Sequence, residues 1–328
     1  MEQIITGNFN SDIRYPMEDS GNIVQRCPEN PILTAKDTPY SCNSIFNPAA
    51  VMYGEETILV FRVENKVGFS ALGLARSKDG VHFEIYPEPI LLPSTEEPFA
   101  RYEVYGLSDP RVSKIGEAYY LVYAAYSELG VHPVVARTYD FISFERISLI
   151  AEPDNRNVVL FPELINGEYV RLDRPMGEIN TAPGIWISYS PDLVYWGKHQ
   201  FVMGPRPVHW DCNKIGPGAP PIKTERGWLE IYHGVRKTVA GDIYRLGCVL
   251  LDLNDPARII GRAMPYILSP EEPYERSGDV GNVVFAGGAV LDDYGETIRI
   301  YYGASDQCVC LATARVDDLI SLCVNNVR

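Results

Sequence analysis

The sequence predicts an all-β protein: a five-bladed β-propeller with an N-terminal arm and few short helices. One observation is that a turn containing glycine leads into a hydrophobic, aromatic-rich segment five times along the 328 residues. A second is that another recurring motif follows each of these segments by about a dozen residues or more. A third is that 27 glycines and 25 prolines are spread along the chain, as frequent turns require. Two motifs that recur in alternation are typical of stacked or radial repeats.

The glycine-turn segments have the alternation of β-strands rather than the 3.6-residue period of helices, as in Thr297–Tyr301. Successive turn glycines lie 62, 51, 60 and 68 residues apart. Such a spacing accommodates roughly four strands and their turns, which make up one propeller blade. The segments are 53–63, 115–126, 165–175, 224–235 and 293–304, with turn glycines Gly54, Gly116, Gly167, Gly227 and Gly295.

The second motif recurs at 75–84, 136–145, 188–197, 250–259 and 312–321. A pair of β-sandwiches or a mixed fold is the alternative, but five copies that cover nearly the whole chain favour the propeller. Short helices are expected only near 49–53 and 316–322. Residues 1–40 are polar and poor in strand pattern, so we expect them to form an arm packed on a single domain at 41–328.

The composition excludes several classes of protein. A net charge of −14 disfavours nucleic acid and an anionic membrane surface as partners. The chain has no signal-peptide pattern, and no apolar run approaches the length of a spanning helix. The seven cysteines form no C-x-x-C pair, so we expect reduced thiols and a cytoplasmic protein. Cys308 and Cys310 share one face of a strand-like run and are expected to be buried.

The polar residues before each glycine turn are the candidates for function, because the first strand of each propeller blade lines the central channel. These segments contain the carboxylates Asp109 and Asp279, the cations Arg156 and Lys214, and the amides of Asn47 and Asn157. If the segments are in register, these groups converge on one axial pocket. The five segments are residues 43–48, 105–111, 155–162, 212–217 and 278–284.

The following strands add Arg62, Arg174, His233 and Tyr244. Guanidinium and ammonium groups that point at one spot make a site for an oxyanion such as phosphate. The alternative is that these residues are solvated strand ends or charges paired between blades.

Other chemistries lack a signal. The five histidines are scattered without a zinc-binding spacing, so no metal site is predicted. No nucleophile elbow, Walker loop or dinucleotide fingerprint is present. Trp186, Trp196, Trp210 and Trp228 are candidates for sugar-stacking platforms or core residues, and Trp196 and Trp228 are assigned to packing because they fall in the repeat motifs.

These motifs together resemble glycoside hydrolase family 130, the inverting β-mannoside phosphorylases with a five-bladed propeller fold. The resemblance runs over nearly the whole chain. It is carried by Ser44-Ile45-Phe46-Asn47, Tyr105-Gly106-x-x-Asp109-Pro110-Arg111, Asn155-Arg156-Asn157-x-x-Leu160-Phe161-Pro162, Arg174-Pro175, Lys214-Ile215-Gly216, Ile231-Tyr232-His233-Gly234 and Gly278-Asp279-Val280-x-Asn282-Val283.

The resemblance implies phosphorolysis of a β-mannosidic bond, which releases α-mannose 1-phosphate and a shortened acceptor. It implies that Asp109 is the proton donor and acts through a sugar hydroxyl. The positions that match the family's phosphate site are Arg156, Asn157, Arg174, Lys214, His233 and Tyr244, and those near the mannosyl unit are Asn47, Arg62 and Asp279. Inorganic phosphate is a co-substrate and no cofactor is expected. The N-terminal arm is a candidate contact with a second copy of the chain.

Two alternatives remain at the level of sequence. An inverting β-mannosidase that uses water requires a carboxylate base opposite Asp109, for which Asp279 and Glu64 are the candidates. A sugar-binding propeller without catalysis requires no acid at all.

Overall fold

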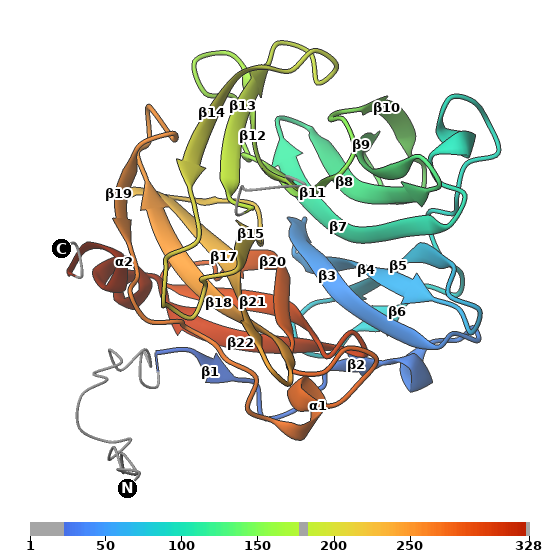
Figure 1. Ribbon diagram of the computed structural model, residues 1–328. Helices are drawn as coiled ribbons and strands as arrows, with labels where there is room; N and C mark the ends of the chain where they lie inside the picture. The colour runs from blue at the N-terminus through green and yellow to red at the C-terminus, as the bar shows by residue number, and fades with distance from the viewer. Residues whose placement is uncertain (1–22, 177–182, 326–328) are drawn as a thin grey trace, which may run out of the picture.

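The computed structural model describes residues 23–176 and 183–325, which fold into β-sheets with few helices (Figure 1). The largest sheet has eight strands in two antiparallel groups. A single parallel residue pair, Ser70 of β5 with Gly106 of β7, joins the two groups. The first group is β3 (Ser44–Tyr53), β4 (Glu56–Glu64), β5 (Ser70–Ser77) and β6 (Glu84–Ile85), and the second is β7 (Gly106–Ile115), β8 (Ala118–Ser127), β9 (Gly130–Thr138) and β10 (Glu145–Leu149).

Three further sheets follow in chain order, each mainly antiparallel between consecutive strands. The first is β11 (Asn155–Leu160), β12 (Tyr169–Pro175), β13 (Ile185–Ser190) and β14 (Gly197–Met203). The second is β15 (Lys214–Pro217), β16 (Ile222–Thr224), β17 (Gly227–Thr238), β18 (Gly241–Leu251) and β19 (Ile259–Arg262). The third is β20 (Val284–Leu291), β21 (Thr297–Ala304) and β22 (Cys308–Arg315), with β1 (Gln25–Arg26) and β2 (Leu33–Thr34) paired to β22.

The first strands of these groups, β3, β7, β11, β15 and β20, lie toward the middle of the ribbon diagram (Figure 1). They contact one another: β3 contacts β7 and β20, and β11 contacts β7 and β15. Five hydrophobic clusters fill the spaces between groups. They join β4–β5 to β8–β9, β8–β9 to β11, β11–β13 to β15–β18, β17–β18 to β20–β22, and β4–β5 to β20–β22.

The first motif forms turns, and three of the five copies of the second motif form a turn held by a hydroxyl and an aspartate. Gly54, Gly116, Gly167 and Gly295 have φ between 61° and 83°, the left-handed region that favours glycine. In the second motif, the hydroxyl of Ser77, Thr138 or Ser190 accepts a hydrogen bond from the amide three residues later, at 2.8–2.9 Å. An aspartate two residues after each hydroxyl accepts hydrogen bonds from the backbone amides two and three residues further along the chain. These side-chain turns explain the recurring sequence at 75–84, 136–145 and 188–197, whereas 312–321 lies in β22 and α2.

The helix predicted near 316–322 is confirmed as part of α2 (Val316–Asn325), which buries Leu319, Ile320 and Cys323. The helix predicted near 49–53 is wrong. Those residues belong to β3 and pair with β4, because cross-strand pairing outweighs the weak local helical preference of two alanines. The remaining helices are short: η1 (Ala35–Asp37), η2 (Phe99–Arg101) and α1 (Pro273–Arg276). No helix in the part of the chain that the structure describes is long and apolar enough to cross a membrane.

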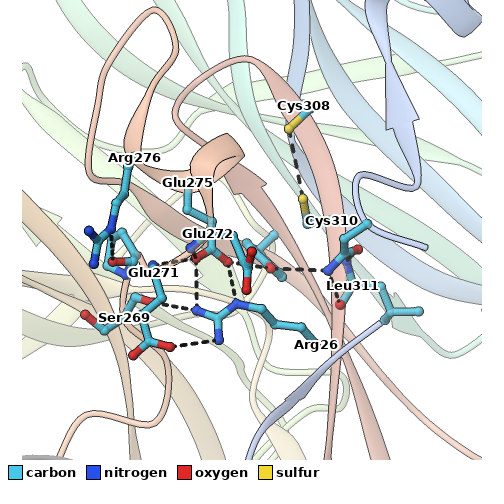
Figure 2. Close-up of polar contacts among 12 residues, drawn as sticks. Arg26, Ser269, Glu271, Glu272, Glu275, Arg276, Cys308, Cys310 and Leu311 are labelled. Atoms are coloured by element: carbon cyan, nitrogen blue, oxygen red, sulfur yellow. Dashed lines mark hydrogen bonds and ion pairs between the residues drawn. The ribbon is translucent and has the colours of Figure 1, made fainter. Parts of the chain in front are cut away.

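The described part of the N-terminal segment is anchored at Arg26 in β1 (Figure 2). Its guanidinium forms a bidentate ion pair with Glu275 of α1, with Nε–Oε1 and Nη2–Oε2 distances of 2.8 and 2.9 Å. Glu275 is fully buried, and the hydroxyl of Tyr302 also donates to it at 2.8 Å. Cys308 and Cys310 are buried free thiols, as predicted, with sulfur atoms 4.0 Å apart.

Candidate active site

Three of the predicted site residues occupy the same place in three first strands. Asn47, Asp109 and Asn157 have φ of 48°, 49° and 57°, and each lies where the register shifts, in β3, β7 and β11 respectively. Asparagine and aspartate tolerate this left-handed conformation better than other side chains. A bulge turns the side chain away from the regular alternation of the strand. Because the bulges coincide, the three side chains meet in one cavity.

This central cavity has a volume of about 230 Å³. It brings together seven of the ten predicted site residues: Asn47, Arg62, Asp109, Arg156, Asn157, Arg174 and Tyr244. The other lining residues are Tyr126, Val280, Val283, Phe285 and Asp306.

One side of the cavity is acidic. The amide of Asn47 donates to Oδ1 of Asp109 at 2.9 Å. Arg62 forms an ion pair with Glu64 at 2.5 Å, so the Glu64 carboxylate already has a partner. Beneath them, the buried guanidinium of Arg111 donates to the backbone oxygen of Asp109 at 3.0 Å and to that of Gly218. Burial lowers the pKa of Arg111 to about 10, so it stays charged at neutral pH.

Two further arginines, Arg156 and Arg174, line the cavity. Arg156 donates to the hydroxyl of Tyr126 at 3.1 Å, and Nη1 of Arg174 lies 2.9 Å from Nε2 of His233. Burial, and secondly the charge of Arg174, lowers the pKa of His233 well below its ordinary value. His233 is therefore neutral and accepts a hydrogen bond from the arginine. Burial also lowers the pKa of Arg174 to about 10, which still leaves the group charged near pH 7.

Three predicted site residues do not line the cavity directly. His233 lies behind the wall and contacts Asn157 as well as Arg174. The Lys214 ammonium lies 5.1 Å from the centre of the Tyr244 ring and 3.9 Å from the Asp242 carboxylate. Asp279 is exposed at the surface and accepts a hydrogen bond from Asn43 at 2.9 Å. The sequence gives the chain positions of these three residues but not how deep each side chain lies in the fold.

Asp306 is the residue that sequence reasoning missed. It lies in the turn between β21 and β22 with φ of 51° and lines the cavity. Burial, and secondly the charge of Asp109, raises the pKa of Asp306 to about 7. At the level of sequence, only Asp279 and Glu64 are candidates for a second carboxylate opposite Asp109. That choice is wrong, because Asp306 lines the cavity. The sequence feature that could have identified Asp306 is the polar pair Ser305-Asp306, which directly follows the fifth glycine-turn segment at 293–304.

The arrangement can bind an anion next to a carboxyl group. In the described residues, neither Arg156 nor Arg174 forms an ion pair with a carboxylate, so both keep charge available for a ligand. No group of three or more histidine, cysteine, aspartate or glutamate side chains within residues 23–176 and 183–325 is arranged to hold a metal ion.

The fold and this site together define a carbohydrate-active β-protein family. The chain belongs to glycoside hydrolase family 130, whose family model, described as beta-1,4-mannooligosaccharide phosphorylase, matches residues 17–325. It is 39% identical over 309 residues to a beta-1,4-mannooligosaccharide phosphorylase of Ruminococcus albus, covering 92% of this chain and 91% of that one. It is 36% identical over 308 residues to a 1,2-beta-oligomannan phosphorylase of a Thermoanaerobacter species, covering 90% and 98%.

A solved structure gives the same result. The beta-1,2-mannobiose phosphorylase of Listeria innocua, in complex with beta-1,2-mannobiose, superimposes with a TM-score of 0.83 at 32% identity. The alignment covers 92% of this chain and 99% of that one.

Proposed function

We propose that this protein cleaves β-mannosides by phosphorolysis with inversion, which gives α-D-mannose 1-phosphate and a shortened acceptor. The observation that carries the proposal is the position of Asp109 in one cavity with Arg156 and Arg174, two cations without a carboxylate partner among the described residues. A cavity with fixed guanidinium groups suits phosphate, because the planar fork of arginine matches its oxygens. The names of the curated relatives support the same reaction.

In the proposed mechanism, phosphate is bound by Arg156, Asn157 and Arg174, with Lys214, His233 and Tyr244 behind or beside them. A phosphate oxygen attacks the anomeric carbon from the face opposite the leaving oxygen, which inverts the configuration. Asp109 gives a proton through a sugar hydroxyl to the oxygen of the departing acceptor. Phosphate is itself the nucleophile, so no protein base has to activate water. Asn47, Arg62 and Asp279 are assigned to the mannosyl unit.

We also infer that the sheets form a five-bladed β-propeller. The eight-stranded sheet then counts as two blades, because only one residue pair joins its halves. The five hydrophobic clusters link each group of strands to the next and the last group to the first, which supports a closed ring. In this description residues 41–328 are one catalytic domain and residues 1–40 are an arm, whose strands β1 and β2 extend the last sheet. Residues 1–22 lie outside the described part.

The decisive experiment incubates the enzyme with β-1,4- and β-1,2-mannobiose, each with and without inorganic phosphate. We expect mannose 1-phosphate to form only with phosphate, and its α anomer to be seen by NMR at early times. Asp109→Asn should lower kcat by about 10²–10⁴-fold, the typical contribution of a general acid. Release of mannose at the same rate without phosphate would replace phosphorolysis by hydrolysis.

A further inference from the structure

A groove lies on the other side of β11 and β12 from the central cavity. Asn155 and Asp173 line the groove, whereas the residues that follow them, Arg156 and Arg174, line the central cavity. Successive side chains of a strand point to opposite faces, so the groove and the cavity share these two strands as a common wall. The groove consists of two adjoining spaces of about 440 and 400 Å³, which share the lining residues Glu152, Pro153, Arg171 and His199.

The floor of this groove is a buried polar network. Arg171 and Asp173, both 2% exposed, form an ion pair at 3.1 Å. The amide nitrogen of Asn155 donates to Asp173 at 3.0 Å. The amide oxygen of Asn155, a residue only 6% exposed, has no hydrogen-bond partner among the described residues. A buried acceptor without a partner costs free energy, and such groups gather where a ligand or ordered water completes the bonding.

The wall of the groove carries an exposed tryptophan, Trp186. Trp186 lies opposite Asp173 on the neighbouring strand β13, and Phe201 lies opposite Trp186 on β14. The two rings are 5.7 Å apart in an edge-to-face arrangement, and their residues are 37% and 54% exposed. Trp210 and Trp228, in contrast, are buried in the core. An exposed tryptophan, supported by a second aromatic ring and next to a polar floor, is the composition of a ligand site rather than of a sheet surface that faces water only.

The charges of the groove indicate a neutral ligand. Glu152, Asp154 and Asp173 offset Arg171 and His199, so the groove lacks the cationic excess of the central cavity. A sugar fits this combination, because the C–H face of a pyranose ring packs on tryptophan while its hydroxyls pair with carboxylates and amides.

We propose that this groove binds mannosyl units of the same β-mannoside chain that is cleaved in the central cavity, at a distance from the cleaved bond. The inference rests on the proposed function, and it adds a chain-length preference. Binding at the groove raises the affinity for long chains, because the second contact is made within an already bound molecule. A disaccharide whose two units flank the cleaved bond in the cavity has no further unit for the groove and gains nothing.

The test compares Trp186→Ala with the wild type on mannobiose and mannopentaose of the linkage that the enzyme cleaves. We expect KM for mannopentaose to rise at least fivefold, with kcat and the kinetics on mannobiose unchanged. Trp186→Phe, which retains an aromatic face, should restore most of the affinity for mannopentaose. Tyr294→Ala, which removes an exposed aromatic ring on the distant β20–β21 turn, is the matched control and should leave both substrates unaffected.

An unchanged ratio of kcat/KM for the two substrates in Trp186→Ala would overturn the proposal, and so would an equal loss on both. Titrations of tryptophan fluorescence without phosphate separate this outcome from a failure of the proposed function. If the wild type cleaves neither mannobiose, the phosphorylase assignment fails. In that case the titrations alone test the groove. The groove proposal holds if mannopentaose of either linkage binds more tightly than mannobiose and if Trp186→Ala loses this difference, and it fails otherwise.

Discussion

The side-chain nitrogen of Asn47 lies 2.9 Å from Oδ1 of Asp109, and both residues have left-handed backbone conformations at bulges of neighbouring first strands. The bond fixes the rotation of the carboxyl group inside the cavity. The backbone of Asp109 is held independently, since the buried Arg111 donates to its carbonyl oxygen. Asn47 is therefore placed to position the carboxyl group of Asp109, the proposed acid.

Asn47→Gly and Asn47→Ala separate the backbone role of this residue from that of its amide. Both variants lose the bond to Asp109, and we expect kcat to fall by about three- to tenfold in each, since a hydrogen bond to a protonated carboxyl group contributes roughly 0.5–1.5 kcal/mol. Only alanine is strained at φ of 48°, by about 1 kcal/mol. Urea unfolding should therefore show Asn47→Ala to be less stable than Asn47→Gly. Wild-type kcat in the glycine variant would contradict the positioning role.

Arg174→Gln tests the proposed anion site. The variant removes a buried cation that bonds to His233, and we expect KM for phosphate to rise by about ten- to a hundredfold. KM for the mannoside should change far less. The measurement is initial rate against phosphate concentration at saturating mannoside. Arg101→Gln is the control, because Arg101 is exposed and forms an ion pair with the equally exposed Glu97. An unchanged phosphate KM in Arg174→Gln would remove this residue from the site.

Asp306 should make stability fall as the pH rises. Its folded pKa of about 7 lies above the ordinary value of 3.8, so the folded protein retains a proton that the unfolded chain loses. The resulting penalty grows from about pH 4 to pH 7 and is constant above, with an upper limit of roughly 4 kcal/mol. Asp306→Asn removes it. We expect the variant to gain stability over the wild type between pH 5 and pH 8 in urea unfolding. A pH-independent difference between the two proteins would show that Asp306 does not titrate in this range.

Arg26→Gln tests the anchor of the N-terminal segment. Glu275 is fully buried, and removing its partner leaves an uncompensated charge, so we expect a loss of about 3 kcal/mol in the free energy of unfolding. Arg315→Gln breaks an exposed pair with Glu296 and should cost less than about 1 kcal/mol. Equal effects in denaturant titrations would mean that the Arg26 pair contributes no more than a surface contact.

Much of the fold could be predicted from the sequence, because its repeats are local. Period-two alternation, turn glycines such as Gly54 and Gly116, and the hydroxyl–aspartate turns each depend on a few consecutive residues. The family motifs add the catalytic candidates for the same reason, as short stretches of the first strands. The strand at 49–53 was predicted incorrectly, since its pairing with β4 is stronger than its own preference.

The sequence by itself determined the all-β repeat and the strands that carry cations and carboxylates. Only the tertiary structure decided which of them share the cavity: Asp306 inside, His233 behind the wall, and Asp279 at the surface. The same holds for the pairing of Trp186 with Asp173 in the groove. The physical reason is that bulges and cross-strand register set the direction of each side chain, and both depend on residues far away in the sequence.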